Sequence, residues 1–140
     1  MQSVQSYRDL RVWKEAMHLA EMSYRHTKGF PRHELFGLTS QIRRAATSIP
    51  ANIAEGYGRQ NKGSYVQFLR IAQGSCKELE THVLLAGRVL GDVASRTGQV
   101  LRQADVVGKM LQGLIRSLRS DSRTTPSRKS IVELEQSSRE

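Results

Sequence analysis

Apolar residues recur every three or four positions in four segments of this chain, and short glycine-containing breaks separate the segments. The last of the four carries them at positions 101, 104, 108, 111, 115 and 118. A seven-residue apolar repeat is typical of helices that pack at a small angle to one another. Short connections make consecutive helices run antiparallel. The pattern therefore predicts an all-α fold, an antiparallel up-down-up-down four-helix bundle.

The expected helices cover residues 10–27, 34–54, 65–90 and 101–118. The first should turn inward Leu10, Trp13, Met17, Ala20 and Tyr24, with Asp9 as its N-cap. The second should bury residues 35, 38, 42, 45, 49 and 53, and the third residues 65, 68, 72, 76 or 75, 79, 83, 86 and 90. Residues 1–118 then form the bundle. Residues 119–140 are rich in Ser, Thr and charge without a periodic face, which predicts a disordered polar tail.

The stretch SIPANIAEG, residues 48–56, places a proline inside the second expected helix. Proline removes one backbone hydrogen bond and is costly in a helix interior. The apolar stripe nevertheless continues from Ile49 to Ile53, so we expect the helix to bend at Pro50 without ending. Ser48 and Asn52 are the groups placed to satisfy the carbonyl of Ala46. We interpret the polar members of this motif as structural, capping the turn or contacting a neighbouring helix or subunit: Ser48, Pro50, Asn52, Glu55 and Gly56.

Several function classes have no support in the sequence. No apolar run approaches the roughly 20 residues that span a bilayer, so we expect no membrane segment. The first residues contain no hydrophobic signal segment, and Cys76 is the one cysteine, so we expect a cytoplasmic protein without disulfides. No phosphate-cradling loop is recognisable. We expect no cofactor.

Catalytic and metal chemistry are likewise not expected. Glu15 and His18 have the Glu-x-x-His spacing of di-iron bundles, but both should point away from the core and a second such pair is missing. Cys76 falls on the buried stripe, where a thiol is usually inert. We expect His26 and His82 at the surface or an interface. Gly74 and Gly108 should allow close approach of helices. The chain is therefore not expected to be an enzyme or to bind a metal.

The net charge is +9, and residues 1–118 hold 17 basic and 9 acidic residues, a net charge of +8. The excess therefore belongs to the folded body and not to the tail. Such a balance favours polyanionic partners, chiefly nucleic acid. The alternative is a soluble basic protein without a polyanionic partner.

Basic residues recur on the sides of the third and fourth helices that lie opposite the core. We take them as candidate phosphate contacts: Arg70, Lys77, Arg88, Arg102, Lys109 and Arg116. Lesser candidates lie on the second helix and the following loop: Arg43, Arg44, Arg59 and Lys62. Tyr57 is the only loop aromatic near a cationic cluster that could stack on a base. The alternative is ordinary solvated helix faces. The hypothesis requires Arg70 and Lys109 to be free of neutralising acidic neighbours.

Three stretches carry a family resemblance: RDLRVWKEA (8–16), FPRHELFGLTSQIRRAATSIPANIAEG (30–56) and YVQFLRIAQGSCKELETHVLLA (65–86). Over roughly residues 7–118 the chain resembles the small four-helix-bundle proteins encoded in intervening sequences of bacterial 23S ribosomal RNA genes. The resemblance implies a ring-like homopentamer. A related branch serves diversity-generating reverse transcriptases as accessory subunits, where a basic surface binds nucleic acid. The resemblance implies no enzymatic activity.

Residues and resemblance together predict a homo-oligomeric, non-catalytic bundle that binds RNA or DNA through backbone phosphates. Apolar residues off the core stripe of the third helix also favour self-association: Val66, Ile71, Leu84, Leu85 and Val89. The alternative is a protein-interaction scaffold. Such a scaffold would dock a reverse transcriptase or a ribosomal partner and bind no nucleic acid itself.

Overall fold

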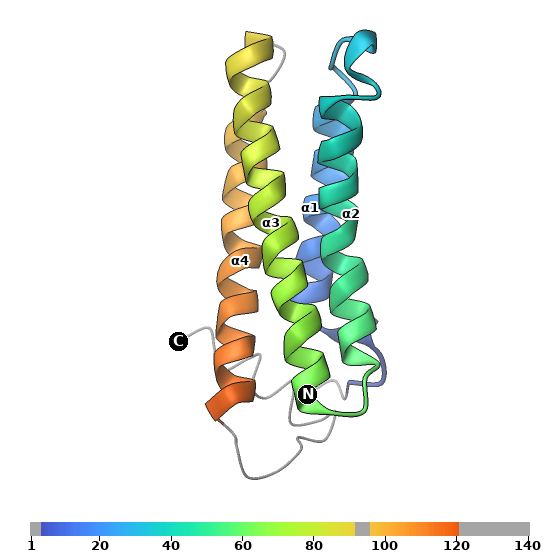
Figure 1. Cartoon of the computed structure of the whole chain (residues 1–140), viewed down its shortest axis with the longest axis vertical. Helices are drawn as coiled ribbons and strands as arrows, with labels where there is room; N and C mark the ends of the chain where they lie inside the picture. Colours follow the sequence, from blue (N-terminus) through green and yellow to red (C-terminus); the bar gives the residue numbers. More distant parts are fainter. Residues whose placement is uncertain (1–3, 92–95, 121–140) are drawn as a thin grey trace.

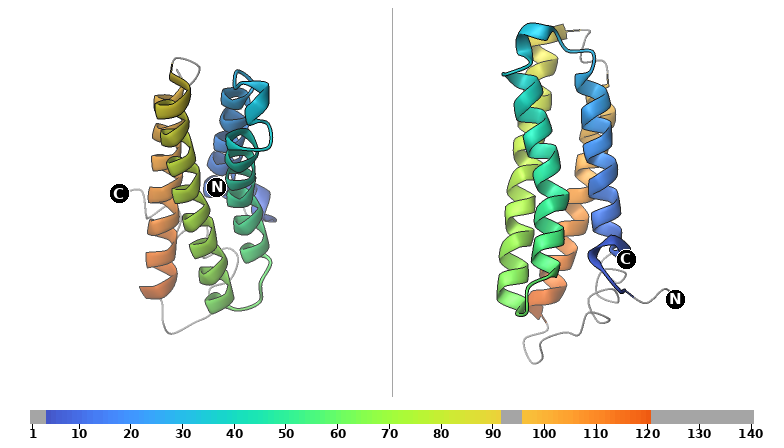
Figure 2. Two further views of the ribbon diagram at one scale, coloured as in Figure 1. Left: turned by 45° about the horizontal axis from the view of Figure 1, so that its top comes forward. Right: turned by 90° about the vertical axis from the view of Figure 1, so that its right-hand side faces the viewer.

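The computed structural model of the chain describes residues 4–91 and 96–120, and in these ranges it is an antiparallel four-helix bundle (Figure 1). The helices are α1 (Arg11–Thr27), α2 (Leu38–Tyr57), α3 (Lys62–Leu90) and α4 (Thr97–Ser120). Two 3₁₀ turns, η1 (Tyr7–Asp9) and η2 (Arg32–Glu34), precede α1 and α2. Each helix packs against the next along the chain, and α4 packs back against α1, which closes the bundle (Figure 2). The expected fold is confirmed.

One apolar core runs through the bundle and is built mainly from Leu, Ile, Val and Ala. The predicted stripes of the second, third and fourth helices supply most of it, including Ile49, Leu79 and Leu111, which are fully buried. None of the helices that the structure describes is long and apolar enough to cross a membrane. The fourth helix extends two residues past its predicted end. The predicted disordered tail lies outside the described residues from 121 onward.

The inward face of α1 differs from the predicted one. Its buried residues are Val12, Ala16, Leu19, Ala20, Ser23, His26 and Thr27. Leu10 and Ala20 of the predicted face are buried, whereas Trp13 is half-buried and Met17 and Tyr24 are exposed, so the prediction is correct only in part. Trp13, Met17 and Tyr24 lie on the flank of α1 that faces α2. The prediction that His26 lies at the surface is also wrong, since His26 is 3% exposed.

The helix starts also differ from the expected ones. Leu10 is the N-cap of α1 and makes no side-chain capping bond. Asp9 instead belongs to the capping box of η1, where its carboxylate accepts hydrogen bonds from the backbone N–H groups of Gln5 (2.8 Å) and Ser6 (3.2 Å). Those bonds lower the pKa of Asp9. The second helix begins at Leu38, four residues later than predicted, and Leu35 is exposed.

The helix α2 continues through Pro50, as predicted. The Asn52 amide donates to the backbone carbonyl of Ser48 (2.8 Å) and to its hydroxyl (3.0 Å). The Ser48 hydroxyl also shares a 2.8 Å hydrogen bond with the Ser75 hydroxyl of α3. The amide therefore serves the carbonyl of Ser48 and not that of Ala46. The network links the proline turn to the neighbouring helix.

The glycine that lies where two helices come close is not one of the two that were predicted. A Cβ added at Gly74 or Gly108 would meet no atom within 4 Å, so neither position brings helices together. A Cβ added at Gly56 would lie 2.7 Å from the Cβ of Phe68 and 3.3 Å from the carbonyl oxygen of Tyr65. The close approach of two helices is therefore between the end of α2 and the start of α3.

His26 makes the stability of the bundle depend on pH. Its imidazole packs edge-on against Phe30 with ring centroids 5.1 Å apart, and its Nε2 is buried without a hydrogen-bond partner in the described part of the chain. Burial, with a smaller contribution from the charge of Arg96, lowers the pKa of His26 below its ordinary value of 6.5. Below pH 6.5 the unfolded chain therefore binds the proton more readily than the folded chain does. The contribution of neutral, buried His26 to the free energy of unfolding is therefore fully present above pH 6.5 and is lost progressively as the pH falls below it.

We therefore expect the free energy of unfolding, measured in urea, to fall between pH 7 and pH 5 by up to about 1.4 kcal/mol per pH unit. The variant His26→Leu should show a shallower decline, because it lacks the titrating group. His18→Leu is the matched control, since it removes an exposed histidine from the same helix. Equal slopes for His26→Leu and the unmodified protein would contradict this account.

Candidate nucleic-acid interface

A side-chain hydrogen bond fixes how α3 and α4 line up. The Gln73 amide of α3 donates to the Gln112 amide oxygen of α4 at 2.7 Å. The two helices run antiparallel (Figure 1). A residue before Gln73 on α3 and a residue after Gln112 on α4 are therefore displaced toward the same end of the bundle. This pair serves as the reference for placing the predicted basic rows.

The two rows flank one groove. Arg70 and Arg116 lie about 4.5 and 6 Å along the axis from the glutamine pair, both toward the same end. Lys77 and Lys109 lie on its other side. The groove between the helices has a volume of about 580 Å³, and its lining includes Arg70, Lys77 and Lys109. The packing of α3 against α4 thus brings residues from both predicted rows to one face.

Arg88 and Arg102 continue the rows toward the other end of the bundle. From Arg70 to Arg88 the rise along α3 is about 27 Å, and from Arg102 to Arg116 along α4 it is about 21 Å. At about 3.4 Å per nucleotide of one stacked strand, these lengths correspond to roughly six to eight phosphates. The face is therefore long enough to follow a strand over several nucleotides.

Two acidic side chains lie within the groove and pair with its lysines. The Lys77 ammonium is 3.3 Å from the Glu80 carboxylate, and the Lys109 ammonium is 3.0 Å from the Asp105 carboxylate. The requirement stated for the hypothesis therefore fails for Lys109. Both lysines are well exposed, and exposed pairs contribute about 0–1 kcal/mol, so a phosphate can compete for them. The lysines are nevertheless weaker candidates than sequence alone indicated.

Four arginines of the two rows retain uncompensated charge: Arg70, Arg88, Arg102 and Arg116. All four are exposed, and none makes a hydrogen bond or ion pair with another side chain in the described ranges. The requirement therefore holds for Arg70. Arginine offers a planar fork of donors that suits phosphate oxygens. These four side chains are the strongest candidate phosphate contacts of the α3–α4 face.

The lesser candidates do not join this face. The Arg59 guanidinium pairs with Glu55 at 3.1 Å and lies 4.7 Å from the ring centroid of Phe68. Lys62 is half-buried at the start of α3. They belong to the α2–α3 connection and are not among the residues that line the α3–α4 groove.

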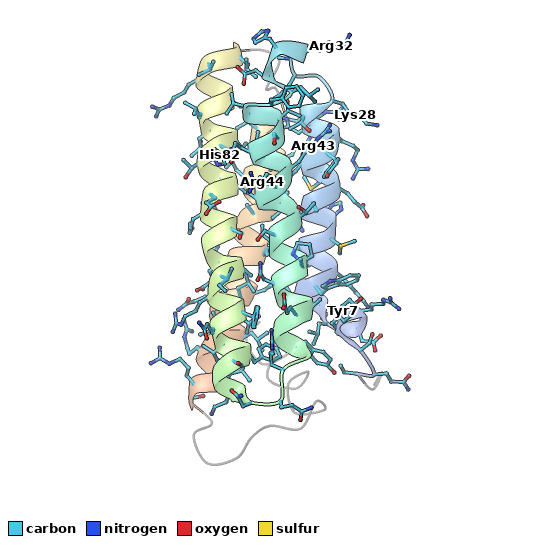
Figure 3. The ribbon with its side chains drawn as sticks, turned by 45° about the vertical axis from the view of Figure 1, so that its right-hand side comes forward. Tyr7, Lys28, Arg32, Arg43, Arg44 and His82 are labelled. Carbon is cyan, nitrogen blue, oxygen red and sulfur yellow. The ribbon has the colours of Figure 1, made fainter. Side chains whose placement is uncertain are left out.

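Arg43 and Arg44 lie near the start of α2 and differ from each other. Arg43 is half-buried, donates from its Nε to the Thr27 hydroxyl at 2.9 Å and stacks over the Tyr24 ring at 4.6 Å. It therefore joins α1 to α2. Arg44 is exposed, and Figure 3 shows it on the outer side of α2 at the level of His82 on α3.

The aromatic prediction is wrong. Tyr57 is the last residue of α2 and is 4% exposed, packed edge-on against Tyr65 with ring centroids 6.3 Å apart. It cannot stack on a base. The most exposed aromatic side chain in the described ranges is Phe36, which lies between η2 and α2 in a segment predicted to be helical. Gly37, which breaks the helical pattern, was the available signal.

The predictions for metal ligands and for the thiol concern Glu15, His18 and Cys76. Glu15 does not point to solvent, because its carboxylate accepts a 2.7 Å hydrogen bond from the Gln103 amide of α4. His18 is exposed, and the described residues contain no group of three potential metal ligands. Cys76 is buried with its sulfur 3.3 Å from the Ala104 carbonyl oxygen. Burial, with Glu80 nearby, raises the pKa of this thiol to about 11, so it stays protonated near neutral pH.

A second groove, of about 850 Å³, runs between α1 and α2. Its lining is mostly apolar and includes Trp13, Met17, Tyr24, Pro50 and Ala54. Trp13, Met17 and Tyr24 are the members of the predicted α1 face that lie outside the core. The bundle thus has a cationic face on α3–α4 and an apolar groove on α1–α2.

Comparison with protein families identifies the chain. The family of 23S rRNA-intervening sequence proteins matches residues 8–113, which covers all of α1 to α3 and most of α4. This chain is a member of that family. No curated protein matches the chain. The matched region includes the proline motif and five of the six candidate basic residues of α3 and α4, and Arg116 lies beyond it.

Proposed function

We infer that this protein is a non-catalytic, self-associating bundle that binds RNA or DNA through backbone phosphates along its α3–α4 face. The observation that carries the proposal is the set of four exposed arginines on α3 and α4 that have no acidic partner in the described ranges, with Arg70 lining the groove between the two helices. Phosphate contacts position a nucleic acid without reading its sequence. The proposal is therefore one of binding with little sequence selectivity.

The apolar surfaces support self-association. The α1–α2 groove exposes Tyr24 and Met17, and the outer side of α3 exposes Ile71, Leu85 and Val89. A concave apolar groove and a convex apolar ridge on one chain can meet head-to-tail between copies. Repeated contacts between two different surfaces close into a ring when the rotation allows. The ring is proposed to be a pentamer, the number that the family resemblance implies, with the α3–α4 arginines left on its surface.

The test uses the purified full chain. In a filter-binding titration with labelled duplex DNA and single-stranded RNA, we expect the logarithm of the binding constant to fall with the logarithm of salt concentration. Four phosphate contacts correspond to a slope of about −3.6 on duplex DNA. Light scattering of the same preparation should give a multiple of the 15.8 kDa chain mass. The absence of binding at low salt would contradict phosphate binding, and a monomer at micromolar concentration would contradict self-association.

A pull-down separates this proposal from a protein-interaction scaffold. Nuclease treatment should release the captured material if nucleic acid is the ligand. Material that stays bound after nuclease treatment, from a protein that fails the filter-binding titration, would favour a protein partner seated in the apolar α1–α2 groove.

A further inference from the structure

The connection between α1 and α2 carries an aromatic side chain that the bundle leaves uncovered. Phe36 is 93% exposed, more than any other large apolar side chain in the described ranges, and Leu35 beside it is 45% exposed. A partly exposed leucine is ordinary on a protein surface. An almost fully exposed phenylalanine presents both faces of its ring to solvent. Its surroundings decide what kind of ligand it suits.

Phe36 projects from a turn that two hydrogen bonds to Glu34 hold in place. The backbone N–H of Gly37 donates to the carbonyl of Glu34 at 3.0 Å, and the backbone N–H of Leu38 donates to the Glu34 carboxylate at 3.0 Å. The same carboxylate lies 2.7 Å from the position that a Cβ on Gly37 would occupy, so a side chain at this position would displace the carboxylate from its present place. The turn is therefore preorganised. A ligand that contacts Phe36 orders little of the loop on binding.

Cations surround this turn. Residues 28–44 hold four basic residues and one acidic residue, a net charge of +3. The acidic residue is Glu34, whose carboxylate is occupied in capping α2. Lys28, Arg32 and Arg44 are exposed, and Figure 3 shows them at the same end of the bundle, around the start of α2. The aromatic ring is thus presented among positive charges.

An exposed aromatic ring among cations is how proteins hold single-stranded nucleic acid, with bases stacked on the ring and phosphates near the charges. We propose that Phe36 stacks on an unpaired base of an RNA or DNA strand whose phosphates lie on Lys28, Arg32 and Arg44. This rests on the proposed phosphate binding along α3–α4, and it adds a preference for unpaired bases. A duplex keeps the faces of its bases covered, so it cannot use the ring.

The place of the turn in the bundle supports the same ligand. The α1–α2 connection lies at the end of the bundle where α3 ends and α4 begins (Figure 1), which is also the end toward which Arg88 and Arg102 extend the arginine rows. A strand bound along the α3–α4 face therefore leads toward the end that carries Phe36. The aromatic ring of Phe36 would hold the strand beyond the last phosphate contacts of the α3–α4 face.

The experiment measures fluorescence anisotropy with three labelled probes of equal length: an unstructured single strand, the same strand with abasic sites, and a duplex. We expect Phe36→Ala to weaken binding of the single strand by about 5- to 150-fold, the range that one stacked base provides. Binding of the abasic strand and of the duplex should change less than twofold, because both use phosphates only. Phe36→Trp should retain full affinity for the single strand.

The outcomes separate this inference from the proposed function. If Phe36→Ala binds the single strand as tightly as the unmodified protein, the stacking inference is wrong while phosphate binding stands. If all three probes fail to bind the unmodified protein, both are wrong. If Phe36→Ala lowers the scattering mass, or abolishes binding to phosphatidylserine vesicles, Phe36 serves a subunit contact or a membrane surface and the inference is overturned. Leu35→Ala is the matched control, expected to change single-strand affinity less than twofold.

Discussion

Replacing Arg70 and Arg116 together by glutamine should weaken the binding of duplex DNA. When the binding constants of the variant and of the unmodified protein are taken as equal on extrapolation to 1 M salt, the variant should bind about 60-fold more weakly at 0.1 M salt. Each phosphate contact adds about 0.9 to the slope of the logarithmic salt dependence, so two lost contacts reduce it by about 1.8. The two side chains come from different helices but lie at one level of the groove beside the Gln73–Gln112 hydrogen bond. Both are exposed, so the fold should tolerate glutamine. The measurement is a filter-binding titration over a range of salt concentrations.

The control carries the same loss of net charge elsewhere. Lys14 and Arg25 are exposed on α1, which packs against α2 and α4. Lys14→Gln together with Arg25→Gln should leave the salt slope within experimental error. An equal loss of slope in both double variants would mean that net charge, and not the α3–α4 face, determines binding.

The variant Lys109→Gln tests whether a lysine of the α3–α4 face contributes as much to the salt dependence as an arginine does. Lys109→Gln removes a side chain that is paired with Asp105 at 3.0 Å, so it should reduce the slope by less than one full contact. The sequence pattern placed lysines and arginines in equivalent positions of the rows. The structure distinguishes them, because acids one turn away on the same helix pair with the lysines only.

The fold could be predicted because its determinants are periodic. The stripes of α2, α3 and α4 repeat with a helical period, and residues such as Ile49, Leu79 and Leu111 are buried as expected. The inward face of α1 was predicted correctly only at Leu10 and Ala20, because two apolar rows run side by side along the helix. The row with the larger side chains was preferred, yet the core takes the row containing Ala16 and Ser23, whose small side chains permit close packing.

The candidate site could be predicted only in part. Periodicity places a residue on a helix face, and this was sufficient to bring the arginines to the outside of α3 and α4. It does not give the register between helices, which depends on contacts such as that of Gln73 with Gln112. It also does not identify loop side chains. Tyr57 is buried as the last residue of α2, while Phe36 is exposed in a turn that the pattern had assigned to a helix.

The second large effect is expected from a single methyl group at the end of α2. A Cβ added at Gly56 would lie 2.7 Å from the Cβ of Phe68 and 3.3 Å from the backbone oxygen of Tyr65. Neither atom is the end of a flexible side chain, so the helices must separate. We expect Gly56→Ala to lower the free energy of unfolding by about 1–3 kcal/mol, the usual cost of overpacking. Urea denaturation followed by circular dichroism measures it.

Gly108→Ala and Gly74→Ala are the matched controls, because each adds the same methyl group inside a helix where no atom lies within 4 Å. Alanine is favoured over glycine in helices, so each should raise the free energy of unfolding by about 0.5–1 kcal/mol. The opposite signs follow from the geometry, since helix propensity alone would make all three substitutions stabilising. Stabilisation by Gly56→Ala would show that α2 and α3 are not in contact at this point. Destabilisation by Gly108→Ala would show that the α3–α4 groove is closed at this position. The predicted basic rows of α3 and α4 would then not flank an open groove.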